Sequence, residues 1–146
     1  MTSCILVGID GSPGGEAALR FAVEEARLRG LSLRVVCAWE APAASYIGET
    51  FVPTADAFLD AEHHAEEVLR TALERLAPNP AVRVEALSVE GHPATVLSEQ
   101  ARDAVLLVVG SRGHGTATGL LLGSVSQGVA HHAPCPLVIV PSLVVE

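Results

Sequence analysis

The apolar positions of the chain fall into five short runs, separated by segments whose apolar residues recur with helical spacing. Continuous apolar runs of this length, bounded by glycine, proline or polar residues, are typical of strands buried on both faces. The expected strands are residues 4–10, 31–39, 82–90, 104–110 and 136–141. Strands that alternate with helices in this way predict an α/β fold, a mostly parallel sheet with helices on both faces.

Four segments between these strands predict helices. The first follows Ser12 and Pro13, a good N-cap residue and a favoured first helical residue, and it ends at Gly30. Its apolar stripe is expected to comprise Ala18, Phe21, Ala22 and Ala26. The other helices are expected at about 55–77, within 91–102 and at about 124–132.

The segment 40–54 has no apolar periodicity and contains Pro42 and Pro53, so it predicts a loop. Because it follows the second strand, a lid that closes over a bound ligand is one hypothesis for its role. No composition break, internal repeat or low-complexity stretch divides the chain, and we expect residues 1–146 to form one domain.

The handedness of the connections indicates where a ligand would bind. Right-handed crossovers favour the first and fourth strands as central neighbours, with the chain winding outward from them in opposite directions. Such an arrangement has a topological switch point, a crevice at the carboxyl ends of the strands where open α/β sheets bind ligands. The loops that enter this crevice are residues 8–12 and 110–124.

The second of these loops is unusually rich in glycine, in the pattern Gly110-x2-Gly113-x9-Gly123-Ser124. Gly110 and Gly113 allow positive φ and let backbone N–H groups face a ligand without an intervening Cβ. The next helix is expected to begin at Gly123, Ser124, Val125 and Ser126. A helix N-terminus favours an anion, and the two serine hydroxyls add donors, so the loop predicts a phosphate site.

Two charged residues extend this candidate site. Arg112 offers a full positive charge to a polyphosphate, and Asp10 offers an acceptor for a ribose hydroxyl or a ligand for a divalent metal. Each feature also has an interpretation without a ligand. The glycines would then form a plain strand-to-helix connection, Arg112 a solvated charge, Ser124 an N-cap and Asp10 a turn residue.

Charge and composition exclude several classes of function. The formal net charge is −8, so the field of the protein opposes binding to nucleic acid or to an anionic membrane. All nine basic residues are arginine. The absence of lysine excludes a P-loop lysine, a Schiff base and a lysine general base.

The cysteines and histidines indicate little chemistry. Three cysteines without CxxC spacing (Cys4, Cys37 and Cys135) are expected to be small buried side chains of a reduced, cytoplasmic protein without a leader or a membrane span. The pairs His63–His64 and His131–His132 diverge around a helix rather than converging on a metal. His92 and His114 lie in loops near the expected crevice.

Three segments together resemble the universal stress protein family in its single-domain, ATP-binding form. They are ILVGIDGSPGGEAALRFAVEEARLRG (5–30), HPATVLSEQARDAVLLVVGSRGHG (92–115) and GLLLGSVSQGVAHHAPCPLVIV (119–140). The glycine–serine spacing given above is similar to the ATP-binding signature of that family. The stretch HGTATG (114–119) departs from it, because relatives often have a Gly-Phe-like pair there.

This resemblance implies a sheet of order 3-2-1-4-5, a homodimer formed partly through the last strand (136–141), and ATP in the crevice. It implies that Gly8, Ile9 and Asp10 line the adenosine side, and that the backbone at Ala38 meets the adenine. It also assigns ribose and phosphate contacts to Gly110, Arg112, Gly113, Gly123, Ser124, Val125 and Ser126.

The functional hypothesis is therefore an ATP-binding, dimeric regulator or sensor of the stress response, with Mg²⁺ or Mn²⁺ accompanying the nucleotide. Efficient ATP hydrolysis is not expected, because no residue stands out as a general base and there is no lysine for the γ-phosphate. Two alternatives remain open. One is a dimeric interaction module that binds no nucleotide, and the other is a slow metal-dependent ATP hydrolase centred on Asp10.

Overall fold

The computed structural model describes residues 3–41, 45–47, 50–52, 55–76, 81–113 and 122–142. The elements in chain order are β1 (Cys4–Gly8), α1 (Pro13–Arg29), β2 (Ser32–Trp39), β3 (Ser45–Ile47), β4 (Thr50–Val52), α2 (Ala55–Leu76), β5 (Val84–Glu90), α3 (Pro93–Gln100), β6 (Ala104–Gly110), α4 (Ser124–His132) and β7 (Leu137–Val140). Each of the nine predicted strands and helices is present, most with ends within two residues of the expected ones.

The main sheet has the order β5-β2-β1-β6-β7, and all of its strand pairs are parallel. In the numbering of the five expected strands this is 3-2-1-4-5, which confirms the predicted topology. β1 lies at the centre, where Val7 is in register with Val35 of β2 and Val108 of β6. The two halves of the chain therefore wind outward from β1 and β6, and the switch point lies between them.

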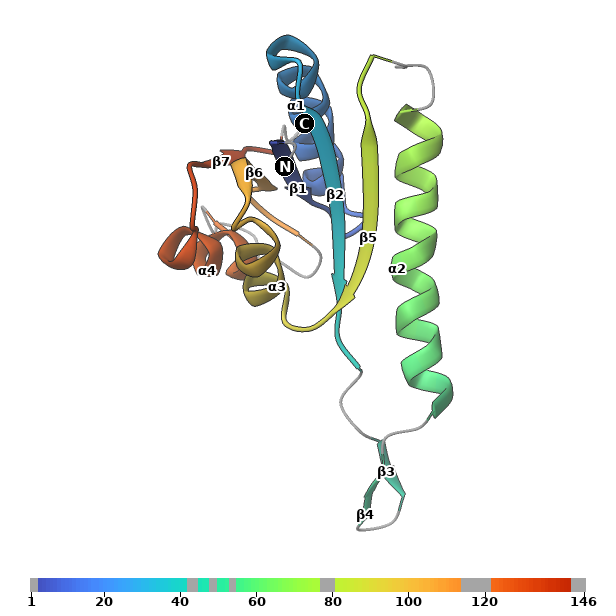
Figure 1. The fold of residues 1–146 in the computed structure, drawn as a ribbon. Coiled ribbons are helices and arrows are strands. Elements are labelled where there is room, and N and C mark those ends of the chain that lie inside the picture. Colours follow the sequence, from blue (N-terminus) through green and yellow to red (C-terminus); the bar gives the residue numbers. More distant parts are fainter. Residues whose placement is uncertain are drawn as a thin grey trace.

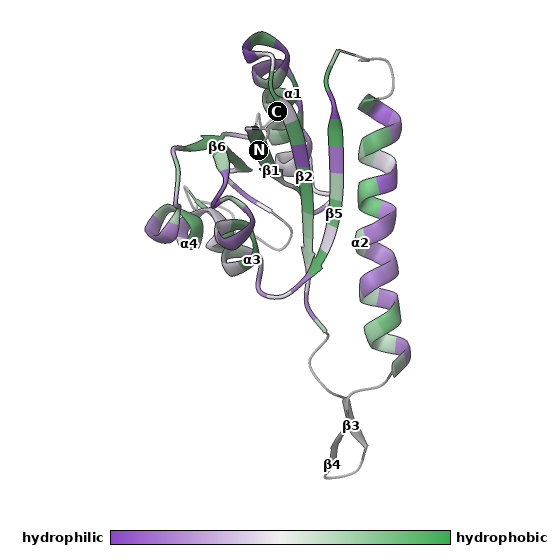
Figure 2. Ribbon diagram, in the orientation of Figure 1, coloured by the Kyte–Doolittle hydropathy of each residue, from purple (hydrophilic) through white to green (hydrophobic). Residues whose placement is uncertain are grey.

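Helices cover both faces of this sheet, as Figure 1 shows. Ile5 and Val7 of β1 pack in one core with α1 and α2, whereas Leu6 packs in the other core with α3 and α4. Successive strand residues point to opposite faces, so a strand buried on both sides is apolar throughout. Figure 2 shows the strands coloured mainly as apolar, while α2 carries many polar residues along its length.

The limits of α1 follow from its sequence. The Ser12 hydroxyl accepts a hydrogen bond from Gly15 N at 3.1 Å, and Gly30 ends the helix in the left-handed region with φ of 65°. The predicted apolar stripe was wrong at Phe21, whose side chain is 36% exposed. Leu19 and Val23 are buried instead, because the face of α1 that packs on the sheet is centred on Leu19, Ala22 and Val23.

The segment predicted as a loop contains a short antiparallel hairpin of β3 and β4. Figure 1 places this hairpin beyond the carboxyl end of β2, away from the main sheet. The prediction failed because two three-residue strands are too short to show a period. The lid hypothesis for residues 40–54 stays a prediction, since much of that segment lies outside the described residues. Within the described ranges, every helix is too short or too polar to span a lipid bilayer.

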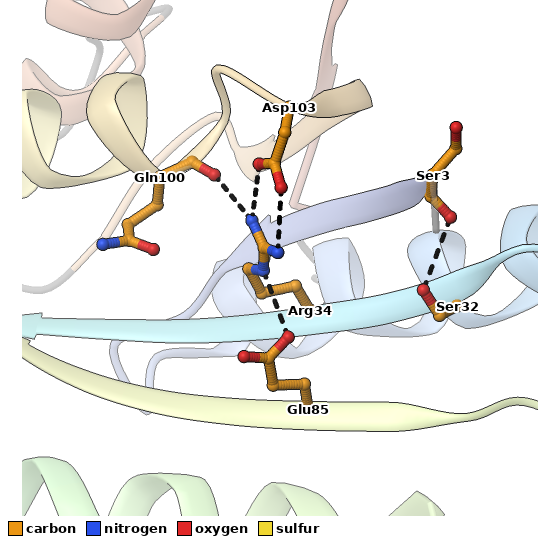
Figure 3. Close-up of polar contacts among 6 residues, drawn as sticks. All are labelled: Ser3, Ser32, Arg34, Glu85, Gln100 and Asp103. Carbon is orange, nitrogen blue, oxygen red and sulfur yellow. Dashed lines mark hydrogen bonds and ion pairs between the residues drawn. The ribbon is translucent and has the colours of Figure 1, made fainter. Parts of the chain in front are cut away.

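A charged cluster ties β2 to its neighbours on the face covered by α3 (Figure 3). Arg34 donates to both carboxylate oxygens of Asp103, at 2.8 and 3.2 Å, and to the carbonyl oxygen of Gln100 at 3.0 Å. It also donates to Glu85 on β5 at 3.4 Å. Because the Arg34 side chain is only 16% exposed, these partners replace the water that the guanidinium loses on folding.

Candidate functional site

A cavity of about 240 Å³ lies at the carboxyl ends of β1, β2 and β6, and we refer to it as the edge cavity. Its described lining includes all eleven residues that the sequence placed in the candidate site: Gly8, Ile9, Asp10, Ala38, Gly110, Arg112, Gly113, Gly123, Ser124, Val125 and Ser126. Five further lining residues were not predicted: Gly15, Val36, Pro93, Leu97 and Val109. The structure thus brings five separate parts of the chain to one concave surface.

The loop between β1 and α1 is held by its own side chains. The Asp10 carboxylate accepts hydrogen bonds from the backbone N–H of Ser12, at 2.9 Å, and from the Ser12 hydroxyl. Ile9 N donates to the carbonyl oxygen of Val36 at 3.0 Å, which extends the contact between β1 and β2 by one residue. The half-buried Asp10 carboxylate is therefore fixed in position at the wall of the cavity.

The glycines let two loops pack against each other. A Cβ on Gly110 would lie 2.6 Å from the carbonyl oxygen of Gly14, and a Cβ on Gly113 would lie 2.5 Å from Asp10 Oδ2. A Cβ on Gly14 would in turn overlap the carbonyl oxygen of Arg112. Gly110 and Gly113 thus allow the second loop to pack closely against Asp10 and the first turn of α1.

Gly110 and Gly113 do not adopt the positive φ that glycine allows. Among the described residues, positive φ occurs at Gly11, Gly30 and Gly91. Sequence spacing drew attention to these glycines but did not predict their packing, because a contact between distant segments leaves no local signal. The glycines at positions 115 and 119 lie outside the described residues.

The N-terminus of α4 forms another wall of the cavity. Gly123 is its N-cap, in extended conformation, and its N–H donates to the carbonyl oxygen of Ser111 at 2.6 Å. The first N–H groups of a helix have no acceptor within the helix, so those of residues 124–126 give this wall a partial positive charge. Ser124 is exposed, whereas the Ser126 hydroxyl is buried, 3.1 Å from the carbonyl oxygen of Ser111 and 3.0 Å from that of Gly123.

Ser124 and Ser126, both predicted as donors to a ligand, therefore differ in how available their hydroxyls are. The Ser126 hydroxyl has one proton, and the acceptors within reach are carbonyl oxygens of its own protein. Ser124 is the exposed serine of the two. Arg112 is half-buried and also lines the cavity.

The opposite side of the cavity is apolar. Val36 and Ala38 contribute from β2, and Leu97 reaches across from α3 to β1, where a Cβ on Gly8 would lie 2.6 Å from Leu97 Cδ1. Alternate residues of a strand face the same side, so the position of Ala38 could have identified Val36. No comparable signal marks Leu97, because its role depends on how α3 packs against the sheet.

The remaining candidates lie elsewhere. His92 is exposed just before α3 and does not line the edge cavity, and His114 lies outside the described residues. The thiols of Cys4 and Cys37 are buried, and burial raises the pKa of Cys37 to about 11, so it stays protonated and unreactive. In the part of the chain that the structure describes, His, Cys, Asp and Glu side chains form no group of three or more that could hold a metal ion.

Comparison with known proteins gives one consistent result. Residues 1–141 match the universal stress protein family. The chain is 41% identical over 139 residues to a universal stress protein of Mycobacterium tuberculosis, covering 92% of this chain and 44% of the relative. It is 36% identical over 142 residues to one of Thermus aquaticus, covering 96% and 99%. The chain thus spans less than half the length of the mycobacterial relative and nearly all of the Thermus one.

Solved structures of this family share the fold. A universal stress protein of Lactobacillus plantarum superimposes with a TM-score of 0.82 at 22% identity, covering 95% of this chain and 97% of the other. A universal stress protein in complex with cAMP gives 0.71 at 28% identity, covering 97% and 98%. One from Archaeoglobus fulgidus in complex with dAMP gives 0.65 at 26%, covering 94% and 96%. The sheet order, the match over almost the whole chain and these relatives lead to one conclusion: the chain belongs to the universal stress protein family.

Proposed function

We propose that the edge cavity binds an adenine nucleotide, ATP with Mg²⁺ or Mn²⁺, and that the protein acts as a nucleotide-dependent regulator or sensor in a stress response. The observation that carries this proposal is the division of the cavity into two sides. Val36, Ala38 and Leu97 form an apolar side that suits a flat base, and Arg112 with the N-terminus of α4 forms a side that suits phosphate. The family relatives in complex with cAMP and dAMP support the choice of an adenine nucleotide.

The described lining residues supply few ligands for the accompanying metal ion. Asp10 is the one carboxylate among the described lining residues, and its position is fixed by Ser12. Mg²⁺ is commonly held by one or two carboxylates together with phosphate oxygens and water. We therefore assign most of the metal coordination to the nucleotide phosphates, with Asp10 as the single protein ligand. When bound, the ion would neutralise phosphate charge beside an acidic protein.

Efficient hydrolysis is not part of the proposal. Asp10 is the only described lining residue with a carboxylate that could take a proton from water, and it is engaged with Ser12. The chain has no lysine to stabilise charge on the γ-phosphate. Slow turnover centred on Asp10 is the enzymatic alternative, and turnover that exceeds a protein-free blank and disappears in Asp10→Asn would favour it.

We propose in addition that two copies associate through β7 and that the protein works in the cytoplasm. β7 is the terminal strand of the sheet, and its four residues are half-buried. An uncovered strand edge with the sequence Leu-Val-Ile-Val presents unpaired backbone groups and apolar side chains. A second copy related by two-fold symmetry would cover both edges at once.

Isothermal titration of ATP and Mg²⁺ into the purified protein tests the nucleotide proposal, with Arg112→Ala as the variant. The matched control is Arg102→Ala, which removes an exposed arginine that does not line the cavity. We expect saturable binding that is weakened about tenfold or more in Arg112→Ala and unchanged in the control, because a charge-assisted phosphate contact is lost. No binding by protein that carries no nucleotide after purification would refute the proposal and favour the interaction module.

A further inference from the structure

A second cavity, of about 300 Å³, lies between α1 and α2, and we refer to it as the interhelical cavity. It is lined by the β1–α1 loop, the first turns of α1 and the middle turns of α2. The two helices cover the same face of the sheet, yet their backbones approach closely at few positions. The ion pair between Arg75 of α2 and Glu16 of α1 bridges them, so the space between the helices is spanned at its rim rather than filled.

The floor of the interhelical cavity is apolar. Ile9 and Leu19 contribute from the side of β1 and α1, and Val68 and Ala72 contribute from α2. Apolar surface without a partner costs free energy in water, and its burial by a ligand would recover that cost. The volume lies at the lower end of the range of small-molecule sites, which suits a ligand of one or two fused rings.

The rim carries charges of both signs, and the surface around it is acidic. Glu16 is paired with Arg75, Glu67 is paired with Arg70 one turn further along α2, and His64 also lines the cavity. The helix that forms one whole wall carries six carboxylates and two arginines, and the chain as a whole has a net charge of −8. This field attracts cations and repels anions.

We propose that the interhelical cavity is a second ligand site, selective for small organic cations with a flat apolar body and a single ammonium group. The apolar body rests on Ile9, Leu19, Val68 and Ala72, and the ammonium group lies at the rim beside Glu67, whose exposed carboxylate it shares with Arg70. Ile9 and Gly15 also line the edge cavity, so a ligand here contacts the loop that carries Asp10. The site stands on its own geometry and does not depend on nucleotide binding.

Three probes that share the indole ring and differ in charge test the proposal: tryptamine (cationic), tryptophol (neutral) and indole-3-acetate (anionic). Each is titrated into the isotopically labelled full chain and followed by two-dimensional NMR. We expect saturable binding of tryptamine with a Kd on the order of 1 mM, the range for a ligand of this size. Tryptophol should bind more weakly, and indole-3-acetate weakest. Absence of saturable shifts with tryptamine, or tighter binding of indole-3-acetate, overturns the proposal.

Two variants locate the site. Thr71→Trp places a large ring in the cavity, whereas Leu73→Trp places it on the exposed side of the same helix. We expect tryptamine affinity to fall about tenfold or more in Thr71→Trp and to stay within about twofold in Leu73→Trp. Equal affinities in the two variants, with folding verified by circular dichroism, place the binding elsewhere and overturn the assignment.

A third variant, Glu67→Gln, keeps the shape of an exposed side chain and removes its charge, which also breaks its ion pair with Arg70. It should weaken tryptamine several-fold and leave tryptophol unchanged, since only the first carries a positive charge. This comparison remains decisive if Thr71→Trp fails to fold. An equal effect on both probes overturns the placement of the ammonium group beside Glu67.

Discussion

Two glycines of the edge cavity permit a sharp test of the packing argument, because the same substitution meets different atoms. A Cβ on Gly110 would lie 2.6 Å from the carbonyl oxygen and 2.7 Å from the carbonyl carbon of Gly14. A Cβ on Gly8 would also lie 2.6 Å from its nearest neighbour, but that neighbour is the terminal Cδ1 of Leu97. A leucine side chain can change rotamer, whereas the backbone at Gly14 is fixed in the first turn of α1.

The expected magnitudes differ accordingly. Overpacking against backbone costs about 3 kcal/mol, at the upper end of the usual range, and loss of glycine freedom in the unfolded chain returns about 0.4–1 kcal/mol. Gly110→Ala should therefore destabilise the protein by about 2 kcal/mol, which lowers Tm by roughly 6 °C for a chain of this size. In Gly8→Ala a shifted Leu97 costs about 1 kcal/mol and the same entropic gain offsets it, so the net change is within about 1 kcal/mol.

Urea unfolding followed by circular dichroism, together with a thermal melt, measures both variants against the wild type. The reasoning is refuted if Gly110→Ala is as stable as the wild type, or if Gly8→Ala is destabilised equally. Either result would mean that the interlocked loops can move apart without cost, and that the glycines are not required for packing.

Two further predictions concern the charged cluster and the edge of the sheet. Hydrogen bonds from Arg34 lower the pKa of the Asp103 carboxyl, so Asp103 stabilises the fold above its unfolded-state pKa and loses that effect as the pH falls through the lower folded-state value. Asp103→Asn should lower the free energy of unfolding by about 1 kcal/mol at pH 7, measured by urea unfolding, since the carboxylate is half-exposed. The difference between wild type and variant should be the same at pH 5 as at pH 7 and smaller at pH 3. A difference that stays constant down to pH 3 would contradict this prediction. Carbonyl oxygens of residues 136 and 140 accept from Leu107 of β6 and from Ser111 just after it, so the backbone of Val138 faces β6 and that of Ile139 faces outward. Sedimentation velocity should show that Ile139→Pro abolishes a dimer without unfolding the monomer, while Val138→Pro disrupts the sheet itself; an intact dimer in Ile139→Pro would exclude pairing through this edge.

Much of the fold could be predicted because its signals are local. Ser12 and Pro13 begin α1, and Gly30 ends it, through contacts within a few residues. The apolar runs define strands buried on both faces, and the handedness of the crossovers then limits their order. The same reasoning fails for Phe21, where the helical period allowed more than one buried face, and for the β3–β4 hairpin, which is too short to show a pattern.

For the candidate site, the glycine–serine spacing and the family resemblance together named eleven residues near the switch point, and all eleven line one cavity. Only the tertiary structure decided that Gly110 packs against Gly14, that the Ser126 hydroxyl is held by backbone carbonyls, and that Leu97 forms part of the apolar side. The interhelical cavity likewise arises between two helices distant in the sequence. The physical reason is the same in each case: caps, turns and periodicity act over a few residues, whereas close packing depends on which distant segments the fold brings together.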